Sequence, residues 1–200
     1  MVKATTNCGR KNRAIIATSS AKLYTLMYIS ILLLGLTFAQ ITSASELREY
    51  TSKNPTPTLE LKDMHGKPHT LSDYSGELVL VNFWAGWCHP CIQEIPELIR
   101  LAEIFKDRPF TILAVNVGDP KHKLPGFVKR MDEHMVILMD TESTEFERWK
   151  GIGLPSTFVV DPAGNIRYEA YGAVNWDRPD VVEAFSTMMN ESAADNGLQQ

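Results

Sequence analysis

Two closely spaced cysteines are the side chains of this sequence best suited to chemistry. Cys88 and Cys91 form a Cys-x-x-Cys pair, and a disulfide between them would close a loop of only four residues. Closing so short a loop stabilises a fold little, because the stabilisation grows with loop length. The spacing therefore favours reactive thiols that exchange disulfides. One thiolate attacks a disulfide, and the second resolves the mixed disulfide that results.

The neighbouring sequence predicts that this pair opens a helix. Residues 78–84 are a continuous apolar run typical of a buried strand, and apolar residues at helical spacing follow over 90–106. Cys88 then lies at the helix N-terminus, where unpaired N–H groups and the helix dipole favour a thiolate. Cys91 lies one turn inside, close enough to attack a mixed disulfide at Cys88. A protonated His89 would favour the thiolate further, and a plain surface position for His89 is the alternative.

The rest of the chain predicts one α/β domain, a mixed central sheet with helices on both faces. A lead-in hairpin is expected at 59–71, from two short polar-apolar segments around a Gly-containing turn. The other expected strands are 78–84, 110–118, 135–139, 156–161 and 165–172. The expected helices are 90–106, kinked at Pro96, then 120–134, 142–150 and 177–189.

The first 44 residues have the layout of an export signal. Basic residues precede an uncharged apolar run at 23–39, and small polar residues follow it. Cleavage after Ala44 is one outcome; an uncleaved membrane anchor is the alternative, because the run approaches the length of a spanning helix. A buried core helix or an organelle transit peptide fits less well. The exported remainder is then divided as follows: 45–57 linker, 58–190 folded domain, 191–200 flexible tail.

Charge and ligand spacing argue against nucleic acid and metal. Residues 45–200 carry 15 basic and 24 acidic side chains, a net charge of -9, which disfavours nucleic acid as a partner. A zinc site would need two ligands besides the cysteines, and among the histidines of the body only His65 and His69 have ligand-like spacing. No organic cofactor or metal is therefore expected, and the redox group would be the Cys88–Cys91 disulfide itself.

Residues 83–91, FWAGWCHPC, resemble the active-site signature of the thioredoxin superfamily. A second match lies further along, in GLPSTFVVD, where Pro155 would be the cis-proline that faces the dithiol in that family. An ordinary trans proline is the alternative. The resemblance implies that the backbone of Leu154 binds an extended substrate peptide. It places Trp87 and His89 beside the reacting sulfur, at the docking surface.

Within the superfamily the chain is most similar to the exported, often membrane-tethered TlpA/ResA-type proteins. The shared features are the N-terminal segment, the lead-in hairpin, the extra α-β unit at 120–139, and Glu94 in a Glu-x-Pro arrangement. The buried aspartate of cytoplasmic thioredoxin is Asn82 here. The acid that accepts the Cys91 proton is therefore expected to be Glu94, unless Glu94 is a solvated helix position.

The resemblance implies an exported thiol:disulfide oxidoreductase that reduces envelope proteins, such as apocytochrome c, through Cys88 and Cys91. Its expected location is the periplasm or the outer face of the inner membrane, with re-reduction by a membrane electron donor. A disulfide oxidase or isomerase of the same fold is the first alternative, because the sequence does not set the redox potential. A non-catalytic peptide-binding module is the second alternative, and a thiol peroxidase fits less well.

Overall fold

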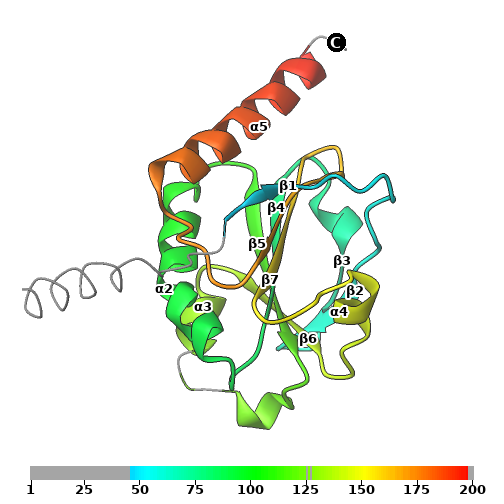
Figure 1. Cartoon of the computed structure of the whole chain (residues 1–200), viewed down its shortest axis with the longest axis vertical. Helices are drawn as coiled ribbons and strands as arrows, with labels where there is room; N and C mark the ends of the chain where they lie inside the picture. Colours follow the sequence, from blue (N-terminus) through cyan, green and yellow to red (C-terminus); the bar gives the residue numbers. More distant parts are fainter. Residues whose placement is uncertain (1–45, 125, 127, 198–200) are drawn as a thin grey trace, which may run out of the picture. The chain divides into compact units, whose positions relative to one another are not determined.

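The computed structural model describes residues 46–124, 126 and 128–197, and the predicted export signal at 1–44 lies outside them. A mixed sheet runs through the described part in the order β1-β8-β7-β4-β5-β6-β2-β3 (Figure 1). Its strands are β1 (Arg48–Glu49), β2 (Glu60–Asp63), β3 (Pro68–Thr70), β4 (Leu78–Trp84), β5 (Phe110–Val117), β6 (Val136–Asp140), β7 (Ser156–Val160) and β8 (Ile166–Tyr171). The helices are α2 (His89–Ile104), α3 (Val128–Asp132), α4 (Thr144–Arg148) and α5 (Pro179–Gly197), with 3-10 turns η1 (Leu71–Tyr74) and η2 (Lys121–Lys123).

Strand β4 is the central strand that leads to the cysteines. It pairs in parallel with β5 and antiparallel with β7. All seven of its residues are buried, because both faces of the sheet are covered. The predicted mixed α/β sheet is confirmed, as is the lead-in hairpin, in which β2 pairs antiparallel with β3.

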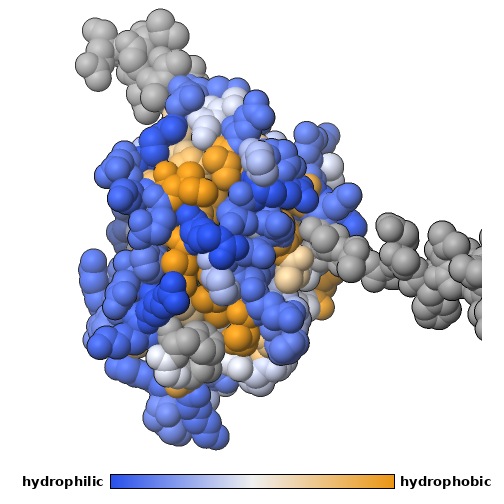
Figure 2. Space-filling view, turned by 90° about the vertical axis from the view of Figure 1, so that its left-hand side faces the viewer, coloured by the Kyte–Doolittle hydropathy of each residue, from blue (hydrophilic) through white to orange (hydrophobic). Residues whose placement is uncertain are grey.

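Alternate residues of β4 face two separate apolar layers, as the period of a strand requires. Leu78 and Leu80 join a core built with α2, α3 and α5. Val79 and Val81 face the opposite core, which includes Trp149 at the end of α4. In Figure 1, α2, α3 and α5 accordingly lie on one side of the sheet and α4 on the other. Figure 2 shows the α2 side, where hydrophobic surface forms a band between hydrophilic side chains.

Three segments differ from the expected elements. The single helix expected over 120–134 is wrong: the structure has η2 and the five-residue α3 instead. The sequence Pro125-Gly126 between them explains this, because proline disfavours a helical residue before it and glycine weakens a helix. Helix α5 continues to Gly197, beyond the expected end at 189. Within 45–57, β1 pairs with β8 at the sheet edge.

None of the helices in the described ranges is long and apolar enough to cross a membrane. The apolar run at 23–39, for which a membrane anchor was the alternative prediction, lies outside these ranges.

Candidate active site

Cys88 and Cys91 form a disulfide at the N-terminus of α2. Their Cα atoms are 5.3 Å apart. Cys88 is the N-cap of the helix, and its Sγ accepts a hydrogen bond from the Cys91 N–H at 3.3 Å. Strand β4 ends four residues before Cys88, so the buried strand fixes where the helix begins. A helix N-terminus favours negative charge, which makes this position suited to a thiolate.

The surroundings of the two sulfurs differ in accessibility. Cys91 is fully buried and Cys88 is nearly so, with 5% of its surface exposed. Trp87, directly before Cys88, is 71% exposed, and His89 and Pro90 are also exposed. Trp87, His89 and Pro90 are therefore open to solvent around the start of α2, and of the two sulfur-bearing residues Cys88 is the more accessible.

Glu94 lies inside the protein, on the same face of α2 as Cys91. It is three residues after Cys91 and only 2% exposed, so the alternative of a solvated position is excluded. Its Oε1 accepts a hydrogen bond from Asn82 Nδ2 at 2.8 Å. Its Oε2 accepts from Trp176 Nε1 at 3.1 Å and from the Val174 N–H at 3.3 Å.

Burial raises the pKa of Glu94 from its ordinary 4.5 to about 7. Desolvation penalises the charged carboxylate and is the largest cause. The hydrogen bonds from Asn82, Trp176 and Val174 favour the charged form and oppose this rise, whereas the charge of Glu97 adds to it. A carboxyl with a pKa near neutrality can both accept and return a proton at physiological pH.

The Leu154–Pro155 peptide bond is cis, as the resemblance implied. Strand β7 begins directly after it, and its first residue, Ser156, pairs with Phe83 near the end of β4. Pro155 therefore lies at the same edge of the sheet as the disulfide. Among the hydrogen bonds of the described residues, none uses the backbone N–H or C=O of Leu154. Peptide binding by these two groups is what the resemblance predicts.

Hydrogen bonds through Asn82 connect β7, the strand that follows Pro155, to Glu94. The Asn82 side-chain amide, buried in β4, donates to Glu94 Oε1 and also to Thr157 Oγ1 at 2.9 Å. The resemblance to the thioredoxin superfamily marked Asn82 as the place where cytoplasmic thioredoxin has an acid. In the structure Asn82 holds the acid that α2 supplies.

Comparison with known proteins agrees with this geometry. Residues 53–169, more than half of the chain, match the AhpC/TSA family. The chain belongs to the AhpC/TSA family. The thiol-disulfide oxidoreductase ResA of Bacillus subtilis is 30% identical over 157 residues, which cover 78% of this chain and 84% of that protein. ResA of Geobacillus kaustophilus is 38% identical over 111 residues, 56% of this chain and 64% of the relative.

The fold is also found in solved structures. The crystal structure of a thiol:disulfide interchange protein of the thioredoxin family from Chlorobium tepidum has a TM-score of 0.56 and 25% identity. The match covers 68% of this chain and 97% of that one. The predicted resemblance to the thioredoxin superfamily and to ResA-type proteins is confirmed, and the AhpC/TSA family match covers the disulfide, Glu94 and Pro155.

Asp119 contacts the loop that leads to Cys88, a position that the sequence did not predict. Its Oδ2 accepts a hydrogen bond from the Gly86 N–H at 2.6 Å and from Asn116 Nδ2 at 3.1 Å. Asp119 follows β5, the parallel neighbour of β4, so both strands end at one edge of the sheet. The signal available in the sequence was a pair of polar residues, Asn116 at the end of this apolar strand and Asp119 just after it.

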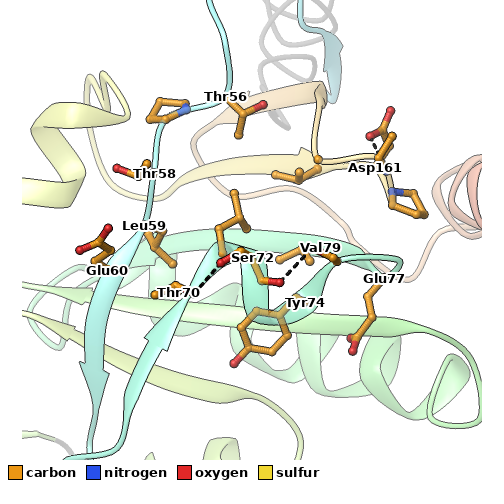
Figure 3. Close-up of a pocket in the computed structure, with 17 residues that line it drawn as sticks. Thr56, Thr58, Leu59, Glu60, Thr70, Ser72, Tyr74, Glu77, Val79 and Asp161 are labelled. Atoms are coloured by element: carbon orange, nitrogen blue, oxygen red, sulfur yellow. Dashed lines mark hydrogen bonds between the residues drawn. The ribbon is translucent and has the colours of Figure 1, made fainter.

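A cavity of about 470 Å³ lies elsewhere in the molecule (Figure 3). It is lined by Val79, near the start of β4, whereas Cys88 follows the other end of that strand. Its hydroxyl groups are largely bonded within the protein. Thr70 Oγ1 lies 2.8 Å from Ser72 Oγ, and Tyr74 OH lies 2.6 Å from His69 Nδ1. Because it lies at the opposite end of β4 from Cys88, this cavity is separate from the dithiol site.

The histidines considered as zinc ligands have other partners. His65 Nε2 lies 2.7 Å from Asp132 Oδ2, and His69 bonds both Tyr74 and Asp63. Within the described ranges no group of three or more His, Cys, Asp or Glu is arranged to hold a metal ion.

Proposed function

We propose that this chain is a thiol-disulfide oxidoreductase that reduces disulfides of exported proteins. The observation that carries the proposal is the Cys88–Cys91 disulfide at the start of α2, at the same sheet edge as cis-Pro155. The similarity to ResA of Bacillus subtilis supports it, since that relative is a thiol-disulfide oxidoreductase. The chain spans 64% of the length of the Geobacillus kaustophilus relative.

The reaction begins with the reduced enzyme. The thiolate of Cys88 attacks one sulfur of a substrate disulfide, so a mixed disulfide forms and the other substrate sulfur leaves as a thiolate. Cys91 then attacks the Cys88 sulfur, which breaks the mixed disulfide and releases the second substrate thiolate. The substrate gains two electrons and two protons, and the enzyme is left with the Cys88–Cys91 disulfide seen in the structure.

The buried groups supply what each step needs. The Cys91 N–H donates to the Cys88 sulfur, and the helix dipole acts on the same atom, so negative charge there is stabilised. Cys91 is buried and must lose its proton before it attacks. We assign acceptance of that proton to Glu94, because its carboxyl is buried on the same helix face with a pKa raised to about 7.

Substrate and location follow from the resemblance to TlpA/ResA-type proteins. The proposal includes export through the 1–44 segment, action in the periplasm or on the outer face of the inner membrane, and re-reduction by a membrane electron donor. Apocytochrome c or another thiol-dependent envelope protein is the proposed substrate. Trp87, His89, Leu154 and Pro155 are proposed to bind it, since they surround Cys88 or share its edge of the sheet.

The reduction potential of the Cys88–Cys91 pair tests the direction of electron flow. We expect a value at or below about -250 mV in glutathione and dithiothreitol buffers, as for a reductase. A value of about -120 to -180 mV would instead identify a disulfide donor or isomerase. Trapping tests the chemistry itself: Cys91→Ser should accumulate a mixed disulfide with a peptide disulfide, and Cys88→Ser should not. If neither variant traps a peptide, the domain is a binding module.

A further inference from the structure

The connection between β5 and β6 concentrates positive charge that the net charge of the domain obscures. Residues 120–131 contain four basic side chains and no acidic one. The rest of the 45–200 region contains 11 basic and 24 acidic side chains. A 12-residue segment of net charge +4 therefore belongs to an otherwise strongly acidic domain. The basic residues are Lys121, Lys123, Lys129 and Arg130, with His122 among them.

A hydrogen bond holds the residue just before this segment to the loop between β4 and α2, which leads to Cys88. Asp119 accepts the N–H of Gly86 at 2.6 Å. Gly86 is two positions before Cys88, and Asp119 is two positions before Lys121. With 3.8 Å between successive Cα atoms, the Cα atoms of Cys88 and Lys121 lie at most about 20 Å apart. Figure 1 draws the η2 turn and the start of α2 at the same lower edge of the domain.

The cations of this turn point to solvent. Lys121, His122 and Lys123 are all exposed in η2. None of the ion pairs formed among the described residues includes Lys121 or Lys123. The lower tip of the molecule in Figure 2, at the height of η2 in Figure 1, is hydrophilic.

We propose that Lys121 and Lys123 form a docking site for an acidic segment of the disulfide-bearing partner. The inference rests on the proposed function and adds a substrate preference to it. An extended chain spans about 3.3 Å per residue, so 20 Å corresponds to acidic residues within about six positions of the reacting cysteine. Complementary charge speeds encounter and sets orientation. A docked acidic segment would lie directly against these lysines, within the screening length of about 10 Å at 0.1 M salt.

Single-turnover kinetics can test this preference without the native electron donor. The prereduced full chain is mixed with one of three synthetic peptides that carry the same internal disulfide. The peptides have three glutamates, three lysines or three serines placed four to six residues from the cysteine. The second-order rate of oxidation of the protein is followed by tryptophan fluorescence, at low and at high salt.

We expect the glutamate peptide to react about three- to tenfold faster than the lysine peptide at low salt, and this ratio to approach one at high salt. The double variant Lys121→Ser/Lys123→Ser should lose the ratio and keep the rate with the serine peptide. Lys53→Ser/Lys106→Ser is the matched control, since both lysines are exposed and Lys106 follows the far end of α2. This control should keep the ratio.

Two results would overturn the inference. One is equal rates with the glutamate and lysine peptides in the unmodified protein at low salt. The other is a preference that survives in Lys121→Ser/Lys123→Ser or that disappears equally in the control variant. Failure of the proposed function itself looks different: none of the three peptides would be reduced, whatever its charge, and the docking assignment would fall with it.

Discussion

Replacing Glu94 with glutamine should remove a large pH-dependent contribution to the free energy of unfolding. The pKa of Glu94 is raised from 4.5 to about 7 in the folded protein, chiefly by burial. The unfolded chain therefore releases this proton at lower pH than the folded protein does. The associated stability is fully present below pH 4.5 and is lost as the pH rises through 7. The interval between these pKa values corresponds to about 3 kcal/mol.

Urea-induced unfolding of the oxidised protein, measured between about pH 5 and 9, gives the relevant free energies. Unmodified protein should lose about 3 kcal/mol across this range relative to Glu94→Gln, in which no proton can be released. Glutamine keeps the shape of the side chain and one oxygen that can accept from Trp176 and Val174. Glu142→Gln is the control, because Glu142 is exposed and its substitution should leave the pH dependence unchanged. Tyr74 and Tyr171, with pKa values raised to about 12, titrate above this range.

Parallel curves for the unmodified protein and Glu94→Gln would refute the reasoning, because they would show that Glu94 has the same pKa in the folded and unfolded states. The same variant also tests the proton-transfer role. In the unmodified protein, the rate at which Cys91 resolves a mixed disulfide should rise with pH through about 7, the folded pKa of Glu94. Glu94→Gln should lose this inflection. If the pH profile of resolution stays unchanged, Glu94 does not accept the Cys91 proton.

Two further substitutions test a hydrogen bond to Glu94 and the packing beside α4. Trp176→Phe removes the indole N–H that donates to Glu94 Oε2 at 3.1 Å, so the pKa of Glu94 should rise further, moving the midpoint of the pH-dependent stability up by about one unit. An unchanged midpoint would show that this bond does not stabilise the carboxylate. Gly151→Ala would place a Cβ 2.0 Å from the Phe146 ring and should destabilise the fold by about 1–3 kcal/mol in urea unfolding. Gly153→Ala, with nothing within 4 Å, is the control and should change stability by less than about 0.5 kcal/mol.

Local sequence was sufficient to predict the position of the disulfide. The seven apolar residues of β4, the cysteine pair and the apolar spacing of α2 are adjacent in the chain. Each of these signals depends only on neighbours, so the strand, the helix start and Cys88 as its N-cap were predictable. The cis bond before Pro155 was implied only by the resemblance, since no local feature distinguishes it from a trans bond.

The burial of Glu94 was beyond local reasoning because its cover comes from a distant segment. Spacing put Glu94 on the face of α2 that carries Cys91, but it did not show whether that face meets protein or solvent. The donors Val174 and Trp176 are 80 and 82 residues further along the chain. They reach Glu94 because the segment between β8 and α5 crosses α2, a tertiary arrangement that no periodicity encodes.

The helix expected over 120–134 is a different case, because the apolar spacing there predicted a longer helix than the structure has. Apolar residues recur there at helical spacing, and Val128 and Met131 are indeed buried in α3. The spacing correctly predicted that these residues are buried. It did not predict a break in the helix, which the sequence Pro125-Gly126 causes. The η2 turn that remains, next to Asp119, is what brings Lys121 and Lys123 to the active-site edge.

The hydrogen bonds of Asn82 link Glu94, the proposed proton acceptor, to β7, the strand that follows cis-Pro155. The Asn82 amide nitrogen donates both to Glu94 and to Thr157, two residues after cis-Pro155. When Glu94 is ionised, the first of these bonds joins a donor to a charged acceptor and becomes the stronger one. The Asn82 amide is then held more firmly by Glu94 than by Thr157. An aspartate at position 82 would place two carboxylic acids side by side in the same buried space and raise the pKa of one of them further. An amide at 82 therefore suits a site in which α2 supplies the acid.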